Sequence, residues 1–181
     1  MSTHRIALAL VLPLLLVAGC ADEEPTADDP AESGSSAAEI DYPEEGVDLV
    51  DPPELKGVYQ QALQTYVDFE RGRRLAAREG KVGRLLSFNA IARVSDPFRE
   101  ALAAYGGTTT YDGDVVIEFL DAKTRDSVLV LDICVDATAL TVPDGAPTQL
   151  GEATRAPQRI EVTNIVGPWR VTKAESVDGT C

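Results

Sequence analysis

The period of the hydrophobic residues changes once in this 181-residue chain, near Tyr111, and that change limits the folds open to it. Before this position, apolar residues recur at three- and four-residue spacing, as on one face of a helix. After it, they alternate with a period of two or form β-branched runs, as in strands. Helices that precede strands predict an α+β domain in which the helices cover the apolar face of a sheet.

Three helices are expected in the first half. The first runs from residue 55 to about 75, because its apolar residues form one stripe opposite a polar face. A shorter helical segment is expected over 85–91, after two glycines that loosen the chain. The third begins at Ser95-Asp96-Pro97, since Asp96 can cap exposed N–H groups and Pro97 has no N–H to leave unpaired, and it ends at Gly106-Gly107. The stripe of the first helix comprises Leu55, Val58, Tyr59, Ala62, Tyr66 and Val67.

Two hairpins are expected in the second half, where the period is two. The first pairs 115–120 with 127–135 across the polar connection 121–126, and the second pairs 158–166 with 169–176 across Gly167-Pro168. The prediction is therefore a curved, four-stranded antiparallel sheet packed against the N-terminal helices.

The amino terminus has the charged, apolar and small-residue order of a secretory signal. Its apolar run, 6–18, is too short to cross the ~30 Å hydrocarbon core of a bilayer. Leu16-Val17-Ala18-Gly19-Cys20 resembles the lipobox of bacterial lipoproteins. This resemblance implies removal of residues 1–19 and lipidation of Cys20, which would anchor the chain at the extracytoplasmic face of the cell membrane. The alternative is ordinary cleavage nearby, with Cys20 left as a free thiol.

Residues 20–54, the lipidated cysteine included, are expected to form an acidic, disordered tether. Positions 21–54 contain 13 Asp or Glu residues, five Pro residues and no Lys or Arg, a composition that cannot build a core. The chain has a formal net charge of −14, but positions 55–181 hold 17 acidic and 15 basic residues and carry only −2. A nearly neutral domain disfavours nucleic acid as a partner.

The chain has three cysteines. If lipid occupies Cys20, Cys134 and Cys181 remain as an even pair in an oxidising compartment, where a disulfide is expected. A redox role would normally need a closely spaced pair with an exposed thiol of low pKa. The bridge is therefore interpreted as structural.

The order of one long helix, two shorter helices and four curved antiparallel strands resembles the nuclear transport factor two-like cone, which ketosteroid isomerase and the polyketide cyclases also use. More narrowly, Asp132-Ile133-Cys134-Val135-Asp136, Trp169-Arg170-Val171-Thr172 and Gly179-Thr180-Cys181 resemble segments of actinobacterial lipoproteins and secreted proteins of unassigned activity. The resemblance implies a cone-like domain over 55–181 and names no reaction.

Few residues offer catalytic chemistry. The sole histidine, His4, lies in the segment expected to be removed, which excludes a Ser-His-Asp unit and a histidine-ligated metal site from the mature chain. No nucleotide-binding loop is present, and no cofactor is expected. A carboxylate in an apolar cavity can act as a general base, so Asp132 with Tyr66 and Trp169 as walls is the candidate pocket. The alternative places Asp132 and Asp136 on the wet face of the sheet.

Arg71, Arg74 and Arg78 share a stripe if the first helix continues beyond residue 75. This stripe is a candidate contact for anionic envelope polymer, lipid headgroups or the carboxylates of a partner. The alternative is an ordinary solvated helix end that interacts with the helix dipole or with the acidic tether.

Three functions follow as hypotheses. The first is a lipid-anchored, noncatalytic domain that binds a small apolar ligand or an envelope protein. The second is an isomerase or cyclase with Asp132 as general base, which requires a dry, enclosed cavity. The third is a structural spacer, which predicts a filled cone and an exposed apolar patch. The sequence does not decide the oligomeric state.

Overall fold

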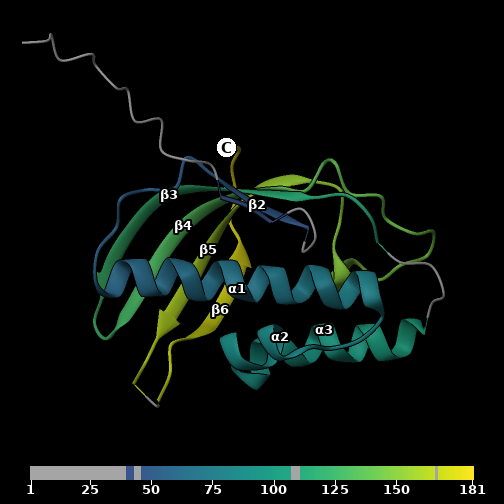
Figure 1. Ribbon diagram of the computed structural model, residues 1–181, viewed down its shortest axis with the longest axis horizontal. Helices are drawn as coiled ribbons and strands as arrows, with labels where there is room; N and C mark the ends of the chain where they lie inside the picture. Colours follow the sequence, from purple (N-terminus) through teal and green to yellow (C-terminus); the bar gives the residue numbers. More distant parts are fainter. Residues whose placement is uncertain (1–39, 43–45, 107–110, 166) are drawn as a thin grey trace, which may run out of the picture. The chain divides into compact units, whose positions relative to one another are not determined.

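Helix α1 (Val58–Glu79) lies across one face of a mixed β-sheet, with two further helices beside it, in a computed structural model that describes residues 40–42, 46–106, 111–165 and 167–181 (Figure 1). These residues belong to one unit, Ser35–Cys181. The fold class is α+β, as predicted, with most of the sheet following the helices in the chain.

The helices are α1 (Val58–Glu79), α2 (Arg84–Asn89) and α3 (Ala92–Tyr105), and a short 3-10 helix, η2 (Thr148–Leu150), precedes the last two strands. The strands are β1 (Ile40–Tyr42), β2 (Val47–Val50), β3 (Val115–Arg125), β4 (Val128–Asp136), β5 (Arg155–Thr163) and β6 (Arg170–Ser176). They form one sheet in the order β1-β2-β3-β4-β5-β6, in which only β2 and β3 pair in parallel.

The four expected strands correspond to β3–β6, but the described sheet has six strands. The two additional strands come from the segment predicted as a tether, so the prediction that the domain begins at residue 55 placed its boundary too late. Val47 and Leu49 alternate with polar Asp48 and pack in the core, which is the period-two pattern of a half-buried strand. The density of acidic residues obscured this short pattern.

The largest differences from the predicted helix boundaries are at the end of α1 and the start of α3, while α1 begins three residues late, at Val58, and α2 ends two residues early, at Asn89. Helix α1 continues four residues beyond the predicted end near residue 75 and stops where Gly80 adopts a left-handed conformation. Helix α3 begins at Ala92, one turn before the predicted start, so that Pro97 lies inside it. The N–H groups of Val94 and Ser95 donate to the carbonyl of Ile91, and the first turn is therefore complete before the proline removes a donor.

The first hairpin is tighter than predicted. Strand β3 continues through most of the expected connection, and only Asp126 and Ser127 separate Arg125 from its partner Val128. Asp126 has a φ of 55°, a backbone conformation that aspartate tolerates in two-residue turns. In the second hairpin, β5 begins and ends three residues earlier than predicted, while the turn falls around Gly167 as expected.

Alternate residues of β4 define the two faces of the sheet. Leu129, Leu131, Ile133 and Val135 point into the core, where they pack with residues of the helices. Figure 1 shows α1 running across this inner face, with α2 and α3 beside it. Helix α2 approaches α1 closely because Gly72 has no side chain: a Cβ there would lie 2.3 Å from the backbone nitrogen of Leu86. The helices therefore cover the sheet as a packed layer.

The predicted disulfide is present. Cys134 of β4 is bonded to Cys181, with their Cα atoms 5.9 Å apart and 47 residues apart in the sequence. The guanidinium of Arg155 also donates to the carbonyl oxygen of Cys181 at 3.1 Å. The carboxyl-terminal tail is thereby tied to the outer face of the sheet.

Removal of this bridge by Cys181→Ser should lower the free energy of unfolding by about 4 kcal/mol, because the unfolded chain regains the entropy of a long loop. Urea denaturation monitored by circular dichroism measures the difference. Reduction of the unchanged protein should produce the same loss, and equal unfolding midpoints for the oxidised protein and the variant would contradict a stabilising role.

Candidate functional site

A groove of about 530 Å³ lies between α1, α3 and the last two strands. This volume falls within the range of roughly 300–1,000 Å³ that small-molecule sites occupy. The residues that line this groove come from two helices, one 3-10 helix and two strands. They are Phe69 and Arg73 of α1, Arg93, Val94, Pro97 and Phe98 of α3, Gln149 of η2, Gln158 of β5, and Thr172, Lys173, Ala174, Glu175 and Ser176 of β6.

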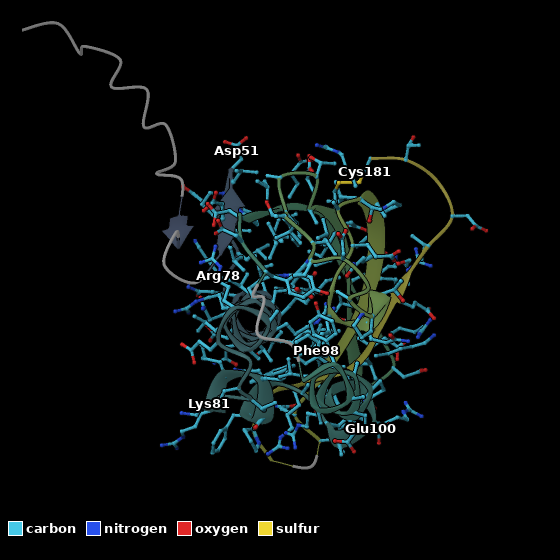
Figure 2. All side chains as sticks on the ribbon, turned by 90° about the vertical axis from the view of Figure 1, so that its right-hand side faces the viewer. Asp51, Arg78, Lys81, Phe98, Glu100 and Cys181 are labelled. Carbon is cyan, nitrogen blue, oxygen red and sulfur yellow. A yellow bond between two sulfur atoms is a disulfide. The ribbon has the colours of Figure 1, made fainter. Side chains whose placement is uncertain are left out.

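The apolar part of the groove comes from both helices. Phe69 and Phe98 are almost fully buried, and in Figure 2 Phe98 lies toward the middle of the domain, whereas Lys81 and Glu100 lie at its margin. The guanidinium carbon of Arg73 lies 5.7 Å from the ring centre of Phe69 and 5.5 Å from that of Phe98. Cation–π attraction to two rings fixes this charge at the wall of the groove.

Arg73 belongs to a buried ion triad on α1. The carboxylate of Glu70 accepts from Nη1 of Arg73 at 2.7 Å and from Nη2 of Arg74 at 3.3 Å. Residues three and four positions apart lie on the same side of a helix, so one turn brings all three together. Burial alone would raise the pKa of the Glu70 carboxyl, but the charges and hydrogen bonds of Arg73 and Arg74 hold this pKa below its usual value. The triad carries a net charge of +1.

Arg74 makes fewer hydrogen bonds than Arg73 does. Only 5% of it is exposed, and its Nε and Nη1 atoms have no hydrogen-bond partner among the described residues. Burial lowers the pKa of this guanidinium. Gly151 makes room for it, because a Cβ at that position would lie 2.6 Å from Nη1 of Arg74. A buried cation with unused donors increases the positive potential inside this part of the domain.

Tyr66 contacts the groove through a hydrogen bond to one of its lining residues, Gln158. Its hydroxyl is fully buried and donates to Oε1 of Gln158 at 3.4 Å. Burial, followed by the nearby Glu70 charge, raises the pKa of Tyr66 well above its usual value, so the hydroxyl stays protonated and remains a donor. Because Oε1 of Gln158 accepts this bond, the amide nitrogen of Gln158 is left to donate at the groove wall.

The rim of the groove carries more cationic than anionic groups. Nζ of Lys173 pairs with the Glu175 carboxylate at 2.7 Å. Arg93 is exposed, and its guanidinium reaches the carbonyl oxygen of Thr172 at 3.5 Å. Among the described residues, no carboxylate pairs with Arg93. The groove therefore combines an apolar interior with an uncompensated positive charge at its rim.

Asp132 lies on the opposite face of the sheet from the groove. It alternates with the inward-facing residues of β4, as do Cys134 and Asp136. Nε of Arg159 donates to Asp132 at 2.7 Å and Nζ of Lys123 donates at 2.9 Å. The assignment of Asp132 to a concave pocket was wrong, and the wet-face alternative describes its position. A strand pattern identifies the residues that share a face but not the face that the helices cover.

This outer face is an ionic surface built from three neighbouring strands. Arg155 pairs with Glu118 and Asp136, and Arg125 pairs with Glu161. Partial burial tends to raise the pKa of Asp132, but the hydrogen bonds and charges of Arg159 and Lys123 hold it below its usual value. A carboxylate stabilised in its charged form is a poor proton acceptor, which disfavours Asp132 as a general base.

The other two residues of the predicted pocket are not brought together at Asp132. Tyr66 contacts the groove through Gln158, as described above. Trp169 is half-buried, and its indole N–H donates to Oε1 of Gln61 at 2.8 Å, near the start of α1. Trp169 is not a wall of the groove.

The predicted arginine stripe does not form one exposed surface. Arg71 pairs with Asp68 at 2.6 Å, Arg74 is buried in the triad, and Arg78 donates to Asp114 and to the carbonyl of Gly113 at 2.9 Å. Each guanidinium pairs with a nearby carboxylate. Helical spacing shows which residues share a side of the helix but not which partners they meet. Among the arginines of α1, Arg73 is the one that lines the groove, and it is not part of the predicted stripe.

The groove residues were visible in the sequence only in part. Phe98 falls within the predicted third helix, and its side chain is buried. No sequence pattern pointed to the other groove residues, such as Arg93, Gln158 and those of β6. They meet only when α3 is placed along the last strand. Cys20 lies outside the described residues.

Within the described residues, no group of three or more His, Cys, Asp or Glu side chains is placed to hold a metal ion. No helix in the same part of the chain has the length and apolarity needed to cross a membrane. The groove offers donors and apolar surface, and its one carboxylate, Glu175, is paired with Lys173. This arrangement is suited to holding a molecule.

Comparison with models of known protein families found no match, and comparison with curated proteins also found none. Among solved structures, the chain is similar to the intermembrane space region of the chloroplast protein ARC6, with 13% sequence identity and a TM-score of 0.46. The alignment covers 70% of this chain and 100% of that structure.

Asp132→Asn should lower the free energy of unfolding by about 0.5–1.5 kcal/mol near pH 7, because two charge-assisted hydrogen bonds are weakened at a partly exposed site. The pKa of Asp132 is lower in the folded than in the unfolded protein, so its contribution is present above the unfolded value of ~3.9 and disappears as the pH falls through the folded value. Urea denaturation at about pH 7 and at about pH 3 measures this difference. Asp144→Asn, in an exposed loop, is the matched control, and an unchanged midpoint for Asp132→Asn near pH 7 would contradict the ion-pair network.

Proposed function

We propose that this protein is a noncatalytic binding module held at the extracytoplasmic face of the cell membrane by lipid on Cys20. The groove carries this proposal, because a cavity of about 530 Å³ with both apolar and polar walls and a positive rim is suited to holding a ligand. Its occupant is a small molecule with apolar character or a segment of an envelope protein.

Binding is favoured over catalysis by the distribution of ionisable groups. A general base needs a carboxylate that faces the substrate and a pKa near the working pH. Asp132 faces away from the groove between two cations, and Glu175 is exposed and paired with Lys173. The alternative of an isomerase or cyclase that uses Asp132 as its base therefore lacks support.

We also propose that the domain is a relative of the nuclear transport factor two-like cones and that the chain is a lipoprotein of the actinobacterial type. A long first helix laid across β3–β6, which are antiparallel and follow the helices in the chain, supports the first part. The lipobox-like segment ending at Cys20 supports the second part.

Cys20→Ser should move the protein from the membrane fraction to the soluble fraction, because diacylglyceryl attachment supplies the two acyl chains that stable anchoring needs. Cell fractionation followed by mass spectrometry of the mature amino terminus measures both the location and the lipid. A variant that still partitions wholly into the membrane would show that the anchor is elsewhere.

A photo-crosslinking amino acid at Val94, on the groove wall, should form adducts with the bound molecule in the native envelope. Ala174→Trp should reduce the adduct yield, because the added ring fills the groove from β6. The same crosslinker at Lys123, on the outer face of the sheet, is the matched control. Equal adduct patterns at both positions, or no adduct at Val94, would contradict a role for the groove.

A further inference from the structure

The groove extends from the inner face of the sheet, at Gln158 of β5, to the edge of strand β6. A cavity above one face of a strand contacts every second residue, because successive side chains point to opposite sides. The groove contacts five consecutive residues of β6, Thr172–Ser176, which include the outward-facing Lys173 and Glu175. Strand β6 is the last strand of the described sheet, so this edge has no neighbouring strand.

The register between β5 and β6 shows which backbone groups point into the groove. The N–H of Val177 donates to the carbonyl of Pro157 at 3.0 Å, which makes these residues a hydrogen-bonded pair of the antiparallel ladder. Such pairs recur at every second residue, so Glu175 bonds with Arg159, its partner in the register. Ala174 and Ser176 are the non-bonded positions, and their N–H and C=O groups point away from β5.

The beginning of this edge is already occupied. The N–H of Ile91 donates to the carbonyl of Val171 at 3.0 Å, and the guanidinium of Arg93 reaches the carbonyl of Thr172. Helix α3 therefore closes the edge up to Thr172 and then runs beside the groove. From Ala174 onward, backbone donors and acceptors repeat at the spacing of a strand and have no backbone partner among the described residues.

The residues that line the groove favour particular side chains in a bound segment. Val94 and Phe98 of α3 face the edge of β6 across the groove and provide apolar contacts for alternate residues of an added strand. Arg93 supplies a charge that no described carboxylate compensates, whereas Lys173 and Glu175 neutralise each other. Charge complementarity therefore favours an acidic residue beside apolar ones.

We infer that the groove binds an extended segment of a partner protein, with apolar residues and an acidic residue, which adds as a strand to the free edge of β6. This inference rests on the proposed binding function and names its partner class. A single-chain amphiphile with an anionic head could also use the apolar walls and Arg93. It would leave the repeating backbone groups of Ala174 and Ser176 unused, so the extended polypeptide is the better fit.

The test uses the full oxidised chain with Cys20→Ser, so that no lipid is attached, and follows amide resonances by NMR. The probe is a blocked seven-residue peptide in which threonine and valine alternate around a central aspartate. We expect the amides of Ala174 and Ser176 to shift most, and we expect a peptide with asparagine at its centre to bind about tenfold more weakly, because a charge-assisted contact is lost.

Two controls test the strand addition itself. Ala174→Pro removes an edge N–H that β5 does not use, and it should bind about tenfold more weakly than Ala174→Val, which adds a side chain of similar size at the same groove position but keeps the N–H. If the proline variant does not fold, an N-methylated form of the aspartate peptide, which cannot donate to the edge, gives the same test. Arg93→Gln should remove the preference for aspartate, and Arg84→Gln, an exposed change on α2, should not.

Sodium dodecanoate is the competing probe. Binding of dodecanoate without binding of the peptide would overturn the inference and leave a small-ligand function standing. Equal binding of the aspartate and asparagine peptides would overturn the acidic preference, and equal binding of the N-methylated peptide would overturn strand addition.

If neither probe binds while Val94 still forms adducts in the native envelope, the partner class is wrong and the groove function stands. If Val94 also forms no adducts, the proposed function fails as well.

Discussion

The buried triad of Glu70, Arg73 and Arg74 is the interaction on which the arrangement of this domain depends. Burying charges is costly unless they pair, and loss of one partner of a buried pair typically costs about 3–5 kcal/mol. Because the triad pairs its charges within α1, this side of the helix can be buried in the domain. That orientation places Arg73 against Phe69 and Phe98, and it brings its guanidinium within 3.4 Å of the carbonyl of Gln149. One helical turn thus connects the core with the groove wall.

The sheet separates two kinds of chemistry. Its inner face carries Leu131, Ile133 and Ile160 against the helices, while its outer face carries the ionic network around Asp132. A carboxylate on the outer face is solvated and paired with cations, so it has neither the dry environment nor the raised pKa of a catalytic base. The groove presents hydrogen-bond donors and aromatic rings, and its one carboxylate, Glu175, is paired with Lys173.

The free edge of β6 explains why a groove exists at this place. An exposed strand edge presents unpaired backbone groups, and proteins usually pair, charge or cover it. Here α3 covers the edge as far as Thr172, and the Lys173–Glu175 pair lies beyond it. The remaining opening has apolar walls because Val94 and Phe98 face it from α3. Incomplete coverage of one edge therefore leaves the opening that we propose as a binding surface.

The sequence by itself determined the α+β class, the order of the three helices and of β3–β6, the pairing of Cys134 with Cys181, and the shared face of Asp132 and Cys134, because periodicity and cysteine parity are local or countable properties. It also predicts a lipid anchor at Cys20, which stays a prediction. The tertiary structure decided that β1 and β2 complete the sheet, that Pro97 lies inside α3, and that Arg74 is buried while Arg73 reaches the groove. It also decided which face of β4 the helices cover. These features depend on where separate elements pack, and a period of two or 3.6 residues defines a face without specifying its neighbour.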